Sequence, residues 1–343
     1  MFADMKLEQN VARENGEGVD SVTKPPTPSY RMQPHEAKDL WDSIEKVIDN
    51  RDLAAFTPDE FVDLALEVTP LLPSGLRRQV IEYRRYAPDG DVVLLRGLLP
   101  EGVTLPATAT APWMPPVGEA QGAALLLTSV TVMLGEPFNY ASLYDGRIVQ
   151  NMVPVRKMEF TQTSQSSTGM LDWHCEDSFR DDRCDYAGLL CLRGDPSGAS
   201  MYAQVKDVQL APDLMATLRE PRFHVRPDPA HVLPGDTPMR PLAIISGSES
   251  APEIAYDTHH LEPIDAADED AAEALRQLGI GLDEVAISHV MEQGDLLLFD
   301  NKRVVHARTP FTARFDGTDR WLMRTMICGS ALTFRRWGQR IPA

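Results

Sequence analysis

Short apolar segments separated by turn-forming residues fill most of the chain after Asp91. They are rich in Val, Ile, Leu and aromatic residues, and several lie beside Gly or Pro, which is typical of short strands joined by turns. This pattern predicts an all-β sandwich or barrel as the core of the fold. The expected strands are residues 92–95, 186–191, 242–245, 295–299, 321–327 and 332–337.

Helical patterns precede the β region and interrupt it once. Apolar residues recur at three- and four-residue spacing after Pro34, and Thr57-Pro58 is typical of a helix start, with Thr as N-cap and Pro in the first turn. The chain is therefore expected to be mainly β with flanking helices. The expected helices begin near Pro34 and at Thr57, and cover residues 74–85, 119–134 and, as an insertion among the strands, 266–279.

The same patterns predict the domain organisation. Residues 1–33 are polar and rich in Pro near their end, so we expect a disordered N-terminal arm. We expect residues 34–343 to form one domain, with a helical N-terminal part over 34–135 followed by the β core.

Charge and composition exclude several classes of partner. The formal net charge of −18 repels phosphate backbones and anionic lipids, which argues against nucleic acid and membrane partners. We see no apolar run long enough to cross a bilayer and no secretory signal, so we expect a cytoplasmic protein. The four cysteines form no CxxC pair and are expected to be reduced thiols.

Two histidines and a glutamate form the pattern with the most chemical content. His174 and Glu176 are one residue apart, so on an extended strand both can point at one ion. His306 lies on a later expected strand. Two His and one carboxylate occupy one face of an octahedral ion and leave the other face open, as in non-haem Fe(II) oxygenases. Chance H-x-E pairs are common, and the alternative is a His bonded to a carboxylate at a surface turn.

Two arginines after His306 favour the metal site. Arg320 follows His306 by fourteen residues and Arg324 lies four residues later, in an apolar segment expected to be buried. A buried arginine needs an anion, and its planar fork binds carboxylates through two hydrogen bonds. An oxygenase with this triad needs a clamp for the distal carboxylate of 2-oxoglutarate, whose other end chelates iron. The alternative is a structural ion pair with one of the many acids.

Together these features resemble the clavaminate synthase-like group of Fe(II)/2-oxoglutarate oxygenases. Within it they are most similar to free amino-acid hydroxylases, such as the arginine and asparagine 3-hydroxylases of peptide-antibiotic pathways. The resemblance implies a distorted double-stranded β-helix core (jelly roll, cupin-like) with helices outside and a mobile lid over the site. The segments that carry it are residues 134–138, 145–147, 173–179, 183–186, 190–193, 294–295, 301, 306–308 and 320–324.

The resemblance also implies roles for single residues. It implies that Arg320 binds the C5 carboxylate of 2-oxoglutarate with help from Ser200, for which an ordinary strand serine is the alternative. It implies that Arg324 binds the α-carboxylate of the substrate and that Asp257 holds the substrate's side chain. Related halogenases have a small residue where this chain has Glu176, so halogenation is disfavoured.

The departures from the resemblance concern the substrate. The relatives hold the substrate's α-amino end with Gln or Glu in the segment before Asp145, whereas this chain has Leu143 and Tyr144 there. Near Asp257, a histidine stands where the relatives have a second acid. A site with fewer acids holds a guanidinium or ammonium less well. We therefore expect an amino acid or amino-acid-derived substrate, free or carrier-bound, without assigning arginine.

The expected reaction is the hydroxylation of an unactivated C–H bond by O₂, with 2-oxoglutarate converted to succinate and CO₂, in specialised (antibiotic) metabolism. Desaturation or cyclisation uses the same cofactors, and no residue pattern separates them from hydroxylation. Two other classes stay open. A zinc hydrolase could use the same three ligands but would leave Arg320 and Arg324 without a task. In a non-catalytic β-barrel binding protein, the His and Glu residues would be incidental.

Overall fold

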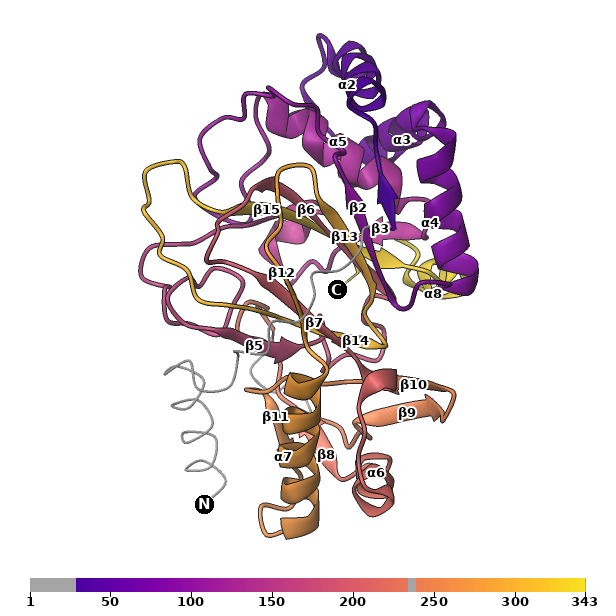
Figure 1. Ribbon diagram of the computed structural model, residues 1–343, viewed down its shortest axis with the longest axis vertical. Coiled ribbons are helices and arrows are strands. Elements are labelled where there is room, and N and C mark those ends of the chain that lie inside the picture. Colours follow the sequence, from indigo (N-terminus) through magenta and orange to yellow (C-terminus); the bar gives the residue numbers. More distant parts are fainter. Residues whose placement is uncertain (1–28, 234–238, 343) are drawn as a thin grey trace.

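The computed structural model describes residues 29–233 and 239–342, which form two main β-sheets with helices around them (Figure 1). Within these residues the larger sheet has seven strands in the order β1-β2-β13-β6-β15-β3, with β4 paired to β15. The smaller sheet has four strands in the order β12-β7-β14-β5, and β9–β10 and β8–β11 form two further pairs. The chain is therefore mainly β with flanking helices, as the sequence predicts.

The strands of the larger sheet are β1 (Tyr30–Arg31), β2 (Val92–Arg96), β3 (Glu136–Phe138), β4 (Gln150–Met152), β6 (Tyr186–Arg193), β13 (Leu296–Asp300) and β15 (Trp321–Cys328). The strands of the smaller sheet are β5 (Leu171–His174), β7 (Ser200–Gln204), β12 (Ile287–His289) and β14 (Val304–Arg308). The remaining strands are β8 (Phe223–Val225), β9 (Ile245–Ser248), β10 (Ala251–Ile254) and β11 (Leu261–Pro263).

Helices α2 to α5 lie beside the larger sheet in the upper part of Figure 1, and α6 and α7 lie below the smaller sheet. Helix α5 packs on β6 and β15, while α2 and α3 pack on α5. Helix α7 contacts α6 and β7. The helices are α2 (Pro34–Ile48), α3 (Pro58–Val68), α4 (Ser74–Tyr86), α5 (Glu119–Thr131), α6 (Pro212–Leu218), α7 (Glu269–Glu284) and α8 (Ala331–Trp337).

Helix α5 is the centre of the main core because it lies between the other helices and the sheet. Every residue from Gly122 to Thr131 is buried, and Leu125, Leu126 and Leu127 are completely so. Gly122 brings the helix close to α2, since a β-carbon there would lie 2.9 Å from the ring of Trp41. One hydrophobic cluster therefore joins the helical N-terminal part to the larger sheet.

Two expected strands are wrong. Residues 332–337 lie in helix α8, whose start is capped by the Ser330 hydroxyl, which accepts the Thr333 N–H at 3.2 Å, and whose end is followed by Gly338 at φ 67°. These two capping residues favour a helix over the strand that the apolar pattern predicts. In the segment 242–245, the named strand β9 begins only at Ile245, and Leu242 forms an isolated bridge with Phe223.

The expected helices are present, with shifted ends. The insertion expected over residues 266–279 is helix α7. It continues to Glu284 because buried residues recur on one of its faces as far as Leu282. Most of the expected N-terminal arm lies outside the described residues. Its last part, Tyr30–Arg31, is strand β1, which pairs in parallel with β2.

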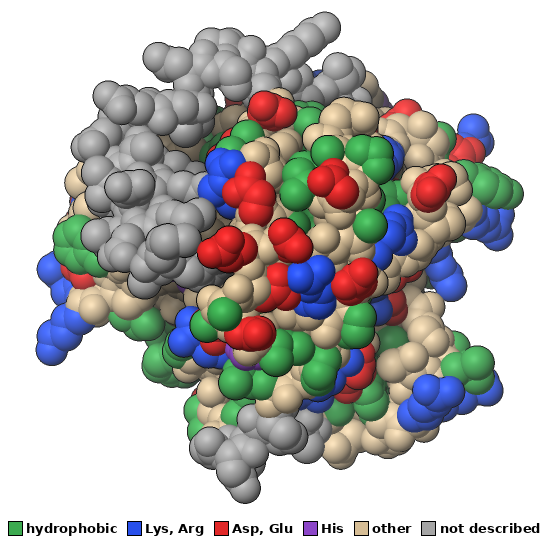
Figure 2. All heavy atoms as spheres, turned by 90° about the horizontal axis from the view of Figure 1, so that it is seen from below, with side chains coloured by type: hydrophobic (Ala, Val, Ile, Leu, Met, Phe, Trp, Pro, Cys, Tyr) green, Lys and Arg blue, Asp and Glu red, His purple; other side chains and the backbone are tan. Residues whose placement is uncertain are grey.

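The surface carries both signs of charge. Figure 2 shows the lower end of the molecule in Figure 1, where acidic side chains are spread among basic and hydrophobic ones. Among the described residues, no helix combines the length and the hydropathy that a membrane crossing requires.

The central position of α5 leads to a stability prediction. Leu127→Ala should lower the free energy of unfolding by about 2–5 kcal/mol, because it opens a cavity between α5 and the larger sheet. Leu66→Ala is the matched control, since Leu66 on α3 is 51% exposed and its loss should change stability by less than about 0.5 kcal/mol. Denaturant unfolding of both variants measures the difference, and equal effects would contradict this role of α5.

A pH dependence follows from Asp300 at the end of β13. Burial, with the charges of Asp91 and Asp185, raises the pKa of Asp300 from 3.8 to about 6. The folded state therefore binds a proton more tightly than the unfolded state, and stability is lost as pH rises through about 4 to 6. Asp300→Asn should be more stable than the parent by about 1–3 kcal/mol at pH 8 and equal to it near pH 4. Thermal unfolding of both proteins across this pH range measures the difference in their stability. A difference that does not change with pH would refute the prediction.

Candidate metal centre

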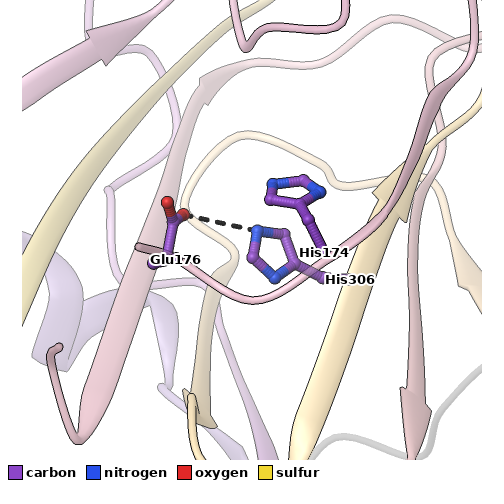
Figure 3. A group of neighbouring side chains, drawn as sticks. All are labelled: His174, Glu176 and His306. Carbon is purple, nitrogen blue, oxygen red and sulfur yellow. Dashed lines mark ion pairs between the residues drawn. The ribbon is translucent and has the colours of Figure 1, made fainter. Parts of the chain in front are cut away.

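The strand register brings the three predicted ligands together. His306 on β14 lies directly opposite His174 on β5, and Glu176 follows two residues after the end of β5. The ligand atoms of these three side chains all lie within 4.8 Å of one another, and the three side chains converge from two segments (Figure 3). Imidazole nitrogens and a carboxylate oxygen at this spacing suit a divalent transition metal.

Hydrogen bonds orient the imidazoles toward a shared position. The Nδ1 of His174 lies 2.8 Å from the carbonyl oxygen of Asp172 and must donate to it, which leaves Nε2 as a free lone pair. The Nε2 of His306 lies 3.3 Å from Oε1 of Glu176. Burial and the neighbouring His174 lower the pKa of His306 to about 4, so this imidazole is neutral and able to bind a metal at neutral pH.

Glu176 is buried as an anion. Burial alone would raise its pKa, but the guanidinium of Arg324 and the two imidazoles outweigh that effect and hold the pKa below its usual value. Arg324 donates to Oε2 of Glu176 and also to Oε1 of Gln150. The backbone of Glu176 is fixed by Asn301, whose side chain accepts its N–H at 2.8 Å and donates to its carbonyl at 3.0 Å.

A second charged group, formed by Arg308 and Arg320, lies next to the triad. Arg320 donates to the Ser200 hydroxyl at 3.0 Å and to the Gly198 carbonyl at 3.1 Å. Arg308 donates to Ser166 and to three backbone carbonyls. Neither guanidinium has a carboxylate partner in the part of the chain that the structure describes, and burial lowers the pKa of both, that of Arg308 to about 9.

Arg308 lies on the strand that holds His306, and Arg320 reaches the same place from the segment just before β15. Arg308 follows His306 by two residues on β14, so both side chains lie on one face of the sheet, roughly 7 Å apart. Ser200 pairs with Arg308 across the ladder to β7 and presents its hydroxyl to Arg320. Two buried cations without a counter-charge are a candidate binding site for an anion.

The predicted substrate residues line a pocket that also contains two of the three triad residues. Leu143, Tyr144, Asp257 and Arg324 all border this pocket together with His174 and Glu176. Asp257 is already engaged, because His260 lies 3.0 Å from its carboxylate and the backbone N–H groups of residues 259 and 260 donate to it. Its two oxygens are therefore less available to a substrate than the sequence alone implies.

Other pocket acids also have histidine partners. Asp172 lies 2.6 Å from His259, and Asp177 lies 2.7 Å from His231. Asp228 differs, since it accepts the N–H of Ala230 at 2.7 Å and forms no ion pair among the described residues.

Sequence reasoning assigned no role to several residues of this site. Asn301 and Arg308 are among the residues that carry the resemblance. The hydrogen bonds of Asn301 to Glu176 and the position of Arg308 near Arg320, however, depend on tertiary packing. Gln150 and Asp228 lie in segments with no motif. For Arg308 a signal existed, because a charged residue two positions after a predicted ligand on a strand must share its face.

Comparisons with known proteins agree with this geometry. Residues 133–326 match the family described as taurine catabolism dioxygenase TauD, TfdA family. The chain is 37% identical over 273 residues to an L-asparagine oxygenase from Streptomyces coelicolor, which covers 78% of this chain and 80% of that protein. It is 33% identical over 283 residues to an enduracididine beta-hydroxylase from Streptomyces hygroscopicus (75% and 82%). It is 30% identical over 277 residues to clavaminate synthase 2 from Streptomyces clavuligerus (78% and 83%).

Solved structures show the same similarity. An asparagine oxygenase in complex with Fe(II), 2S,3S-3-hydroxyasparagine and succinate superimposes with a TM-score of 0.80 at 33% identity, over 90% of this chain and 95% of that chain. The non-haem iron oxygenase OrfP in complex with Fe and alpha-ketoglutaric acid gives a TM-score of 0.80 at 29% identity, over 93% and 100%. The chain therefore belongs to the taurine catabolism dioxygenase TauD, TfdA family, as a relative of clavaminate synthase and the amino-acid hydroxylases.

Proposed function

We propose that this protein is an Fe(II)/2-oxoglutarate-dependent oxygenase that hydroxylates an unactivated C–H bond of an amino acid or an amino-acid derivative. The observation that carries the proposal is the combination on β14 of His306, which belongs to the triad, and Arg308, which belongs to an anion site two residues away. A zinc hydrolase would need the triad but not the anion site. Relatives named as asparagine, enduracididine and ornithine/arginine hydroxylases support the substrate class and a role in antibiotic metabolism.

In this proposal His174, Glu176 and His306 hold the iron. Iron bound there with 2-oxoglutarate would supply the oxidising power to break the C–H bond, with O₂ as oxidant and succinate and CO₂ as co-products. The protein's own task is to keep the imidazole of His306 neutral and Glu176 ionised. Asn301 keeps Glu176 in place, and the buried position of the triad limits access of water.

Arg320 and Ser200 are proposed to bind the distal carboxylate of 2-oxoglutarate. The separation of roughly 7 Å between Arg308 and His306 along β14 suits a five-carbon diacid whose other end reaches the metal. Arg320 offers a planar fork to the carboxylate, and Ser200 holds that fork by its hydroxyl. Arg308 supplies a second positive charge beside it.

Arg324 is proposed to bind the α-carboxylate of the substrate, with Leu143, Tyr144 and Asp257 around the rest of it. Arg324 has N–H groups beyond those that contact Gln150 and Glu176, so it can donate hydrogen bonds to a further carboxylate. The substrate is an amino acid, either free or attached to a carrier. Desaturation or cyclisation would use the same groups.

Three broader features complete the proposal. We infer that residues 34–343 form one oxygenase domain, which the shared hydrophobic cluster of the helices and the larger sheet supports. We infer that the two main sheets form a distorted double-stranded β-helix like that of this enzyme class. We also infer a cytoplasmic location, which four free, buried thiols support.

The cofactor assignment is tested by anaerobic titration with Fe(II) and 2-oxoglutarate, which should produce a weak visible charge-transfer band. Arg320→Ala should weaken 2-oxoglutarate binding by about 100-fold or more, because it removes a charge-assisted pair of hydrogen bonds, and Arg320→Lys by less, because it keeps the charge. Arg276→Ala on the exposed face of α7 is the control. If the intact protein forms no band, the cofactor assignment is wrong.

The role of Asn301 is tested by metal affinity. Asn301→Ala should reduce the affinity for Fe(II) or Mn(II) by about 10- to 100-fold, since Glu176 would lose the group that orients its backbone. Asn139→Ala removes an equally buried amide that bonds to the carbonyls of Leu143 and Arg147, and should leave metal affinity unchanged. Calorimetric titration of both folded variants gives the comparison. Equal metal affinities in both variants would show that Asn301 does not support the metal site.

A further inference from the structure

A second cavity, of about 620 Å³, lies beside the metal pocket. Its lining is mostly apolar and includes Trp113, Val155, Met158 and Val232. Trp113 is 49% exposed and Val232 is 85% exposed, so the cavity reaches the surface with apolar side chains at its edge. Exposed apolar surface next to a polar site indicates that a ligand or partner covers it.

The two cavities share part of their lining. Tyr144, Thr163 and Ala230 line both of them. Tyr144 is held in position by Gln165, whose amide donates to its hydroxyl, and by a backbone at φ 48°, a left-handed conformation that bulky residues seldom adopt. The apolar cavity therefore lies directly beyond Tyr144 from the metal pocket.

We propose that the apolar cavity binds an acyl group carried by the α-nitrogen of the substrate, which makes the substrate class an N-acylated α-amino acid. This rests on the proposed function, which places the α-carboxylate on Arg324 and the side chain between the triad and Asp257. The nitrogen is the remaining substituent of the α-carbon. It then faces Leu143 and Tyr144, which carry no carboxylate, and beyond them the mostly apolar cavity, whose lining includes one acid, Asp145.

Asp228 fits an amide at the same junction. Its carboxylate lines the metal pocket, while the next two residues, Pro229 and Ala230, line the apolar cavity. An acylated nitrogen keeps one N–H, which the Asp228 carboxylate can accept. A free ammonium group would compete for the same carboxylate but would leave the apolar cavity empty.

The test compares free and acylated forms of the same amino acids. The full-length protein, loaded with Fe(II) and 2-oxoglutarate, is assayed for succinate release and for the hydroxylated product with a panel of free amino acids and their N-octanoyl derivatives. For the best amino acid, we expect kcat/KM of the N-octanoyl form to exceed that of the free form about tenfold or more, because several methylene groups leave water. N-acetyl derivatives lack the apolar chain, so their kcat/KM should stay below that of the N-octanoyl form.

A variant tests the cavity itself. Val232→Asp places a charge at its exposed edge and should lower kcat/KM for the N-octanoyl substrate about tenfold, with little effect on the N-acetyl substrate. Val117→Asp, at another exposed apolar residue outside the cavity, is the matched control and should change neither.

Each contrary result has a separate meaning. If free amino acids, or their pantetheine thioesters, are better substrates than the N-acyl forms, the inference is wrong and the proposed function stands. If the Fe(II)/2-oxoglutarate complex forms but no N-acyl substrate is oxidised, the inference is also wrong. If that complex does not form, the proposed function itself fails, and the inference fails with it.

Discussion

The register of β14 against its two neighbours is the constraint on which the rest of the site depends. On one side it sets His306 opposite His174 of β5, and on the other it sets Arg308 opposite Ser200 of β7. A shift by one residue would turn His306 and Arg308 to the opposite face, because side chains alternate along a strand. The candidate metal triad and the candidate anion site are therefore two consequences of one ladder of hydrogen bonds.

Some charged groups around this ladder have a partner that can carry the opposite charge, and others do not. This difference separates structural groups from candidate binding groups. Asp172, Asp177 and Asp257 each lie within 3.0 Å of a histidine nitrogen, so they mainly hold the walls of the pocket together. Arg308 and Arg320 have hydrogen bonds to neutral groups but no carboxylate partner within the described chain. Burying an uncompensated charge is costly, so these two cations are expected to be matched by a bound anion.

The helices contribute by keeping the larger sheet rigid. Strand β15 belongs to that sheet, carries Arg324 within it and has Arg320 just before its first residue. Its packing against α5 holds the backbone that carries Arg324. The apolar cavity lies on the other side of Tyr144, and its lining residues lie outside the helices and strands named above. A rigid centre for the shared chemistry, with loops around the substrate, is how related oxygenases can differ in what they oxidise.

The sequence by itself determined the class of element over most of the chain and the residue types of the site. Apolar periodicity was sufficient for the helices after Pro34 and Thr57 and for strands such as β6 and β15, and the H-x-E step with His306, Arg320 and Ser200 named groups that do lie near one another. These signals are local, since periodicity and spacing are properties of a short segment. Tertiary structure decided what depends on partners distant in sequence. Examples are the helix at 331–337, the hold of Asn301 on Glu176, the occupation of Asp257 by His260, and the cavity beyond Tyr144. The physical reason is that a hydrogen bond, a counter-charge or a cavity wall is made by two segments at once, and one segment's sequence does not specify the other.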